Sequence, residues 1–164
     1  MEIIVIDSGS QEEEGAIVRE YQSRYDRIRY FRTEQRETLY RSWNRAVEKA
    51  QGEYLTNANT DDRHESNCIE ILANTLDENP DCGLCYGNLF KSSDPNQSFN
   101  HQDESNLCES QEFFPASALL HCTNGAQPLW RKALHDQVGL FDEKFKAIGD
   151  HDFAIRLAKN GISS

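Results

Sequence analysis

The sequence has little positive charge and no long apolar run. Its 164 residues include 28 acidic and 17 basic side chains, so the formal net charge is −11. A protein that binds the phosphate backbone of nucleic acid needs clustered Lys and Arg, so we expect no nucleic-acid partner. A membrane-spanning helix needs about 20 consecutive apolar residues, and no stretch approaches that length. We therefore expect no transmembrane segment.

The sequence also lacks the features of a secreted protein. Its first residues, MEIIVIDSGS, contain neither a basic region nor a long apolar one, so they do not form a signal peptide. The five cysteines are an odd number, which fits reduced thiols in the cytoplasm better than a disulfide framework. The length is that of one domain, and 37% hydrophobic residues suffice for a single core.

Strand-like and helix-like segments alternate along the first half of the chain. Short apolar or β-branched runs predict strands, and apolar residues at helical spacing predict helices. Ser10 and Glu13 match a capping box that would begin the first helix. The predicted strands are 3–6, 28–32, 52–58 and 82–87, and the predicted helices are one beginning at Ser10, one over 39–50 and one over 69–76. This order predicts an α/β fold with a mostly parallel sheet, the first strand being covered on both faces.

The second half is less regular. Residues 87–116 are polar and without periodicity, which is typical of a functional or disordered segment. A strand is expected at 116–122, a helix at 130–136, and a last helix after Gly149-Asp150. We expect one domain over 1–164, with further chain belonging before Met1 and after Ser164.

Acidic side chains follow two of the predicted strands, where ligands of such sheets bind. Asp7 could accept hydrogen bonds from a base or ribose, or could serve only the turn chemistry of its loop. Asn59, Asp61 and Asp62 could hold a divalent cation that bridges a diphosphate, or could be an acidic turn before the next helix.

Two further motifs have competing interpretations. Asp150 could be a general base toward a substrate hydroxyl, or an acidic helix start favoured by the helix dipole. Cys82 and Cys85 have CxxC spacing, but on a strand their side chains would point to opposite faces, so we do not expect a redox or zinc pair.

Three segments together resemble the family 2 glycosyltransferases of GT-A fold. EIIVIDSGS resembles their second-strand motif, GEYLTNANTDD their GEY…DxDD segment, and LWRKALHDQVGLFDEKFKAIGDHDFAIRLAKNG their late acidic and Arg-bearing segment. The three occur in the family's order and spacing over nearly the whole chain. The family's first strand and its C-terminal segment are missing.

The resemblance implies a Rossmann-like GT-A domain that inverts the anomeric centre of a nucleotide-diphosphate sugar. It implies Asp150 as catalytic base and Arg156 as the Arg of the last helix. It implies a divalent metal, Mn²⁺ or Mg²⁺, at Asp61 and Asp62, with Asn59 in place of the first Asp of DxD. The implied nucleotide-binding residues are Asp7, Ser8, Arg36, Asn59 and Thr60.

By analogy with the family, the donor is a UDP-sugar and the acceptor a glycan or lipid-linked glycan in polysaccharide biosynthesis. The reaction would take place in the cytoplasm or at the inner face of the membrane. The alternative is a degenerate or truncated GT-A domain that binds nucleotide or glycan, or acts as a scaffold, without turnover. A haloacid-dehalogenase-type phosphotransferase would need Asp where Gly9 stands, and a receiver domain has no place for the GDHDFAIR helix.

Overall fold

The computed structural model describes residues 1–94, 96–99, 103–110 and 127–162. The chain divides into two compact units. The first comprises Met1–Glu53 and Gly139–Phe153, and the second comprises Tyr54–Val138 and Ala154–Ser164. In the described ranges, no helix is both long and apolar enough to cross a bilayer.

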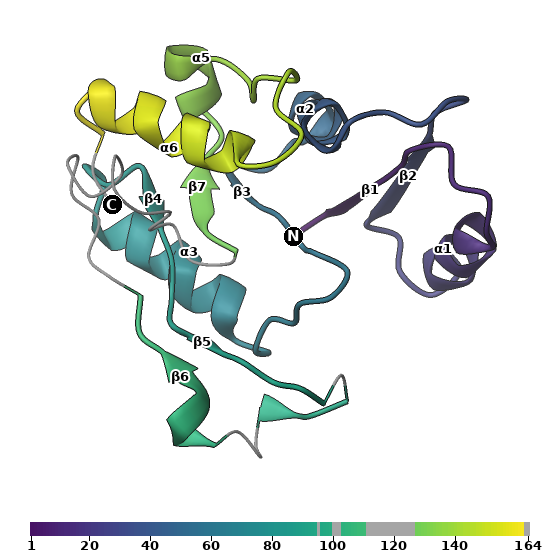
Figure 1. Ribbon diagram of the computed structural model, residues 1–164, viewed down its shortest axis with the longest axis horizontal. Helices are drawn as coiled ribbons and strands as arrows, with labels where there is room; N and C mark the ends of the chain where they lie inside the picture. The colour runs from purple at the N-terminus through teal and green to yellow at the C-terminus, as the bar shows by residue number, and fades with distance from the viewer. Residues whose placement is uncertain (95, 100–102, 111–126, 163–164) are drawn as a thin grey trace. The chain divides into compact units, whose positions relative to one another are not determined.

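The first unit is built on a parallel strand pair (Figure 1). Strand β1 (Ile3–Asp7) pairs with β2 (Ile28–Arg32) in register, from Ile3 beside Ile28 to Asp7 beside Arg32. Helix α1 (Glu14–Gln22) connects them, and α2 (Leu39–Lys49) follows β2. Both strands and α2 confirm the sequence prediction. The expected burial of β1 on both faces is not observed, because Ile3 is 48% exposed.

Helix α1 begins later than the capping box predicts. The backbone N–H of Ser10 donates to the Asp7 carboxylate at 2.8 Å, and the Ser10 hydroxyl donates to the Glu14 carboxylate at 2.7 Å. Ser10 therefore belongs to a turn that Asp7 closes, and the helix starts four residues further on. The prediction of a helix start at Ser10 is wrong because the Asp7 carboxylate, three residues earlier, accepts the Ser10 N–H that the capping box would use.

The second unit contains a three-stranded antiparallel sheet. Strand β7 (Leu129–Arg131) lies between β3 (Tyr54–Thr56) and β4 (Leu84–Cys85), and α3 (Cys68–Glu78) connects β3 to β4. The sheets are thus mixed rather than mostly parallel. The helix expected over 130–136 begins only at α5 (Leu134–Val138), because Trp130 is paired with Leu55 and Leu84 in the sheet.

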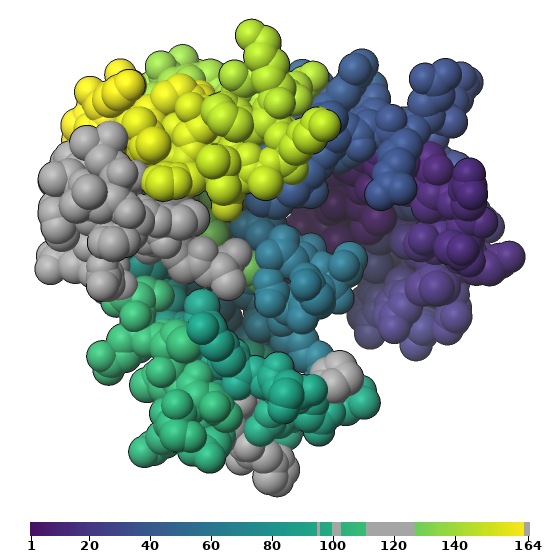
Figure 2. Space-filling view, in the orientation of Figure 1, coloured from purple at the N-terminus to yellow at the C-terminus, as the bar shows by residue number. Residues whose placement is uncertain are grey.

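The polar segment after β4 contains a second antiparallel pair. Strand β5 (Leu89–Phe90) pairs with β6 (Leu107–Cys108), and the 3₁₀ turn η2 (Glu104–Asn106) precedes β6. Most described residues of this segment are exposed, and Figure 2 shows its teal and green atoms at the surface. The strand expected at 116–122 lies outside the described residues.

Each unit has its own apolar packing. In the second unit Leu72, Leu76 and Leu129 form a buried cluster, against which Cys82 and Cys85 pack. In the first unit the buried ring of Phe141 packs on Phe153, with ring centroids 4.9 Å apart. Helix α6 (Gly149–Lys159) matches the predicted last helix; its first residues belong to the first unit and the others to the second.

Candidate functional site

Asp7 ends β1 with a buried carboxylate. Its side chain is 2% exposed and accepts hydrogen bonds from the Tyr30 hydroxyl and from the Ser10 N–H, the latter at 2.8 Å. The Arg32 guanidinium lies 3.4 Å from it. Burial alone would raise the pKa of Asp7, but the two hydrogen bonds and the positive charge of Arg32 outweigh it and hold the pKa below its usual range.

These contacts give Asp7 a structural task in this conformation. Its carboxylate joins the end of β1 to β2 and to the following turn, as the turn interpretation of this residue predicts. Because the Asp7 side chain is only 2% exposed, a nucleotide base could reach its carboxylate only if the residues around it moved. Contact with the base therefore stays a prediction.

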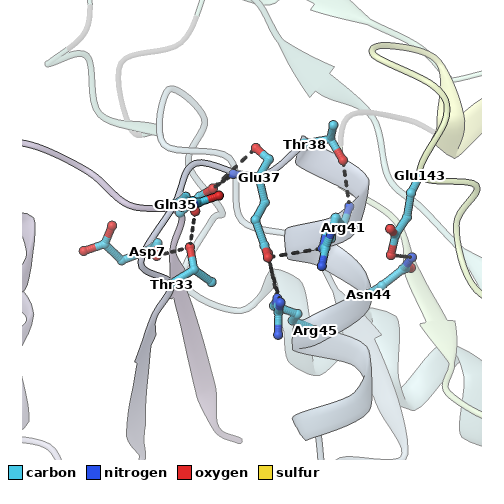
Figure 3. A network of polar contacts seen from close by, with 10 residues as sticks. Asp7, Thr33, Gln35, Glu37, Thr38, Arg41, Asn44, Arg45 and Glu143 are labelled. Atoms are coloured by element: carbon cyan, nitrogen blue, oxygen red, sulfur yellow. Dashed lines mark hydrogen bonds and ion pairs between the residues drawn. The ribbon is translucent and has the colours of Figure 1, made fainter.

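Ser8 connects the loop after β1 to the loop after β2. Its hydroxyl accepts from the Glu37 N–H at 2.5 Å and lies 3.3 Å from the Glu37 carbonyl oxygen. The Glu37 carboxylate in turn accepts two hydrogen bonds from Arg45, at 2.6 and 2.7 Å, and pairs with Arg41 (Figure 3). Hydrogen bonding from Arg45 holds the pKa of Glu37 below its usual range despite partial burial. Glu37 thus fixes both loops to helix α2.

Gly9 allows the same two loops to approach closely. Its φ is +61°, and a Cβ there would lie 2.9 Å from the Gln35 carbonyl carbon and 3.0 Å from the Arg36 nitrogen. Arg36 is exposed, and its side chain has no partner in the part of the chain that the structure describes. The first unit therefore brings Asp7, Ser8 and Arg36 to one loop cluster, with Arg36 open to solvent.

The candidate metal-binding residues Asp61 and Asp62 lie in the loop after β3, in the second unit. The Asn57 amide donates to the Asn59 side-chain oxygen at 3.0 Å, and the Asn59 amide donates to the Asp62 carboxylate at 2.8 Å. Thr60 and Asp61 are exposed at the tip of this loop. Asn59 thus orients Asp62, a role that an Asp at its position could not fill because a carboxylate has no N–H to donate.

The donor set of this loop fits a hard divalent cation. Asp61 carries an exposed carboxylate with no partner among the described residues, and Asp62 keeps acceptor capacity beyond its bond from Asn59. Mg²⁺ and similar ions use one or two protein carboxylates together with substrate phosphates and water. Within the described ranges, no group of three or more His, Cys, Asp or Glu side chains could hold a metal ion. Two carboxylates therefore suit a metal that arrives with a phosphorylated ligand.

Asp150 is partly buried in the first turn of α6. The Tyr40 hydroxyl donates to its Oδ1 at 3.1 Å, although the two residues are 110 positions apart in sequence. Burial, followed by the charge of Asp150, raises the pKa of Tyr40. Arg156, later in α6, donates to the Val138 carbonyl oxygen. Asp150 is therefore held by a specific partner at a helix N-terminus.

Sequence reasoning missed Tyr40, Asn44 and Glu37. Leu39, the first residue of the helix predicted over 39–50, is 50% exposed, whereas its neighbour Tyr40 is 2% exposed. Residues 40, 43, 44 and 47 have i, i+3, i+4, i+7 spacing, which is typical of the buried face of a helix. This spacing identifies Tyr40 as buried if polar residues are also considered for that face. Glu37 has a local signal, because Arg41 lies four residues and Arg45 eight residues after it. Only its contact with Ser8 depends on tertiary structure.

Comparison with known proteins identifies the family of the chain. The sequence profile described as Glycosyl transferase family 2 matches residues 1–138. "Glycosyltransferase GlyG" of Streptococcus pneumoniae serotype 4 is 28% identical over 99 residues, which are 60% of this chain and 33% of that protein. The chain thus spans about a third of this relative.

Two solved structures share the fold. The mannosyltransferase PcManGT of Pyrobaculum calidifontis, in complex with GDP-Man and Mn²⁺, has a TM-score of 0.72 at 18% identity, over 99% of this chain and 44% of that one. Residues 1–349 of S. aureus TarS give a TM-score of 0.68 at 20% identity, over 97% and 46% respectively. The predicted GT-A fold is confirmed by these likenesses. With the profile match over most of its length, the chain belongs to glycosyl transferase family 2.

Proposed function

We propose that the protein is an inverting, metal-dependent glycosyltransferase that moves a sugar from a nucleotide-diphosphate sugar to an acceptor hydroxyl. The observation that carries this proposal is the family 2 match over residues 1–138. The acidic start of α6 and the acidic loop after β3 supply residues of the required chemistry. A UDP-sugar is our first choice of donor; TarS has been solved with UDP-GlcNAc and PcManGT with GDP-Man.

The transfer step needs a base, and Asp150 is the residue we assign to it. Its carboxylate takes the proton of the acceptor hydroxyl while that oxygen attacks the anomeric carbon. The bond from the anomeric carbon to the diphosphate oxygen breaks as the new bond forms, and the electron pair leaves with the diphosphate. Attack from the face opposite the leaving group inverts the anomeric centre.

The leaving diphosphate needs a positive charge beside it, and we propose that a divalent metal bound by the loop after β3 supplies this charge. Asp61 and Asp62 would hold the Mn²⁺ or Mg²⁺, and Asn59 keeps Asp62 oriented. When bound, the metal neutralises charge on the leaving diphosphate. We further assign nucleotide contacts to Asp7, Ser8, Arg36, Asn59 and Thr60, of which Arg36 offers an exposed guanidinium suited to phosphate.

The acceptor is the least constrained part of the proposal. We propose a glycan or lipid-linked glycan, consistent with the polar, exposed surface of the segment around β5 and β6. Sugar hydroxyls are bound by such polar side chains through hydrogen bonds rather than by charge.

A thermal-shift panel with uridine, guanosine and thymidine diphosphates, each with and without Mn²⁺, tests the donor site. A ligand at a hundredfold excess over its Kd stabilises the folded state by about 2.7 kcal/mol. We expect one nucleotide to raise the unfolding midpoint only when Mn²⁺ is present. Asp61→Ala should abolish that metal-dependent shift, and Asp77→Ala, which removes an exposed carboxylate on α3 bonded to Tyr54, should preserve it.

Transfer is tested with Asp150→Asn and radiolabelled donor sugars. We expect this variant to keep the nucleotide shift and lose transfer. A normal transfer rate would remove Asp150 as the base, and an unchanged Mn²⁺-dependent shift in Asp61→Ala would remove the metal assignment. Nucleotide binding without transfer by the wild-type protein would instead support a binding or scaffold module.

A further inference from the structure

Among the described residues, Tyr40 is the most deeply buried polar side chain to which the proposed reaction gives no role. Its ring is 2% exposed and stacks on Phe141 at a centroid distance of 5.9 Å, with Trp43 edge-on at 5.5 Å. A phenylalanine would fill this apolar position equally well, so packing alone does not explain the hydroxyl. A buried hydroxyl without a hydrogen-bond partner is costly, so this one needs polar partners.

Those partners all belong to the first turn of α6. The Tyr40 hydroxyl donates its proton to Asp150 Oδ1, while the backbone N–H groups of Gly149 and Asp150 bond to the hydroxyl oxygen. The first N–H groups of a helix have no partner within the helix. One hydroxyl thus satisfies the start of α6 and fixes one carboxylate oxygen of Asp150.

The backbone around Asp150 is shaped to admit the tyrosine. A Cβ on Gly149 would lie 2.6 Å from Tyr40 Cε2 and 2.8 Å from Cδ2 and Cζ, so only glycine leaves room for the ring. Ile148, which is 64% exposed, has a φ of +57°, a conformation that β-branched residues rarely adopt. Strain of this kind persists where the surrounding structure imposes it, and it concentrates at functional sites.

We infer that Tyr40 is a positioning residue for Asp150. Its hydroxyl holds Oδ1, which leaves Oδ2, with no partner among the described residues, to receive the proton of an acceptor hydroxyl. A carboxylate that is held in one orientation toward the acceptor reacts faster than one that must first rotate into position. This inference rests on the proposed function, because it gives Tyr40 a role only if Asp150 is the base.

Tyr40→Phe tests the inference, since it keeps the ring and removes only the hydroxyl. We expect kcat to fall by about tenfold, because the carboxylate loses its fixed orientation, with the donor KM and the Mn²⁺-dependent nucleotide shift unchanged. Tyr54→Phe is the matched control, because it removes a hydroxyl that donates to another carboxylate, that of Asp77. Its kcat should equal that of the wild type.

A second measurement does not depend on turnover. Tyrosine labelled with ¹³C at Cζ reports the pKa of each phenol by NMR, and Tyr40→Phe assigns the Tyr40 signal. Because the charge of Asp150 contributes to the raised pKa of Tyr40, that pKa should fall in Asp150→Asn. It should not change in Asp77→Asn. An unchanged Tyr40 pKa in Asp150→Asn would contradict the contact itself.

The outcomes separate this inference from the proposed function. Transfer retained by Asp150→Asn would remove the base, and with it any role of Tyr40 in positioning it. Transfer lost in Asp150→Asn but retained within twofold in Tyr40→Phe would overturn the positioning role alone. If Tyr40→Phe does not fold, the tyrosine titration decides: one phenol pKa should fall in Asp150→Asn and not in Asp77→Asn, and the absence of such a signal would overturn the inference.

Discussion

The side-chain amide of Asn44 bonds to both backbone groups of Phe141. Its Nδ2 donates to the Phe141 carbonyl oxygen and its Oδ1 accepts from the Phe141 N–H, both at 2.9 Å. Asn44 is 5% exposed, so water cannot replace these bonds. The pair ties helix α2 to the segment that leads into Asp150, and it fixes that segment independently of any side-chain packing.

Asn44→Ala should therefore be strongly destabilising. The substitution removes both of these buried hydrogen bonds to the Phe141 backbone, which costs about 2–3 kcal/mol. Urea unfolding followed by circular dichroism measures the loss. An unfolding free energy within 0.5 kcal/mol or so of the wild type would show that the Phe141 backbone finds other partners.

Ser42→Ala is the control on the same helix. The buried Ser42 hydroxyl oxygen has no hydrogen-bond partner within the described part of the chain. Removing an unsatisfied buried hydroxyl is near neutral or stabilising. A loss comparable to that of Asn44→Ala would mean that any change in α2 is costly.

Asp7 should make the stability depend on acid pH. Its pKa in the folded chain lies below the ordinary value of 3.8 because hydrogen bonds from Tyr30 and Ser10 and the charge of Arg32 outweigh burial. Its contribution is thus complete above about pH 5 and is lost as the pH falls through 3.8 toward the folded pKa. Asp7→Asn should lower the melting temperature at neutral pH and lose less stability between about pH 5 and pH 3 than the wild type. The same loss of stability between about pH 5 and pH 3 in both proteins would contradict the lowered pKa of Asp7.

The thiol of Cys85 should react more slowly than the free thiol of Cys108. Its Sγ donates to the Leu72 carbonyl oxygen at 3.2 Å, and burial is the main cause that raises its pKa to about 11. At pH 8 about one molecule in a thousand then carries the reactive thiolate. We expect iodoacetamide to label Cys85 at least about tenfold more slowly than Cys108 on β6, as measured by peptide mass spectrometry. Equal rates in the folded protein would contradict this, whereas equal rates in denaturant are expected.

The sequence was informative where local pattern and tertiary structure agree. The bounds of β2 and the start of α2 follow from apolar runs, and Thr38 caps α2 by accepting from the Arg41 N–H. The family resemblance, confirmed by the profile match, rested on three motifs that are local in sequence. Strand bounds, helix starts and local motifs can be predicted from sequence because interactions between residues close in sequence determine them.

The remainder depends on contacts distant in sequence. The segment 130–136 is predicted to be a helix, yet Trp130 lies in strand β7 and pairs with Leu55 and Leu84, which are 75 and 46 positions earlier in the chain. The task of Asp7 likewise depends on Tyr30 and Arg32, which no spacing rule connects to it. The roles of the candidate site residues stay predictions, because testing them requires a bound ligand.

The close approach of the loops after β1 and β2 should make Gly9 irreplaceable. A Cβ at Gly9 meets backbone atoms of Gln35 and Arg36 at 2.9 and 3.0 Å, and its φ of +61° is costly for any residue with a side chain. Gly161 has a similar φ of +72°, but a Cβ there has nothing within 4 Å. The conformational cost of about 1–2 kcal/mol applies to both positions, whereas the steric conflict applies only to Gly9.

Gly9→Ala should therefore destabilise the protein more than Gly161→Ala does, by about 1 kcal/mol or more. Thermal unfolding of the two variants is compared directly. The conformational cost of a positive φ is common to both, so the difference between their melting temperatures reports the steric conflict at Gly9. Gly9→Ala should also weaken nucleotide binding if Arg36 contacts the diphosphate, since relief of the clash must move the Gln35-Arg36 backbone. Equal melting temperatures of the two variants would mean that the two loops separate without cost, and that this loop cluster is not rigid.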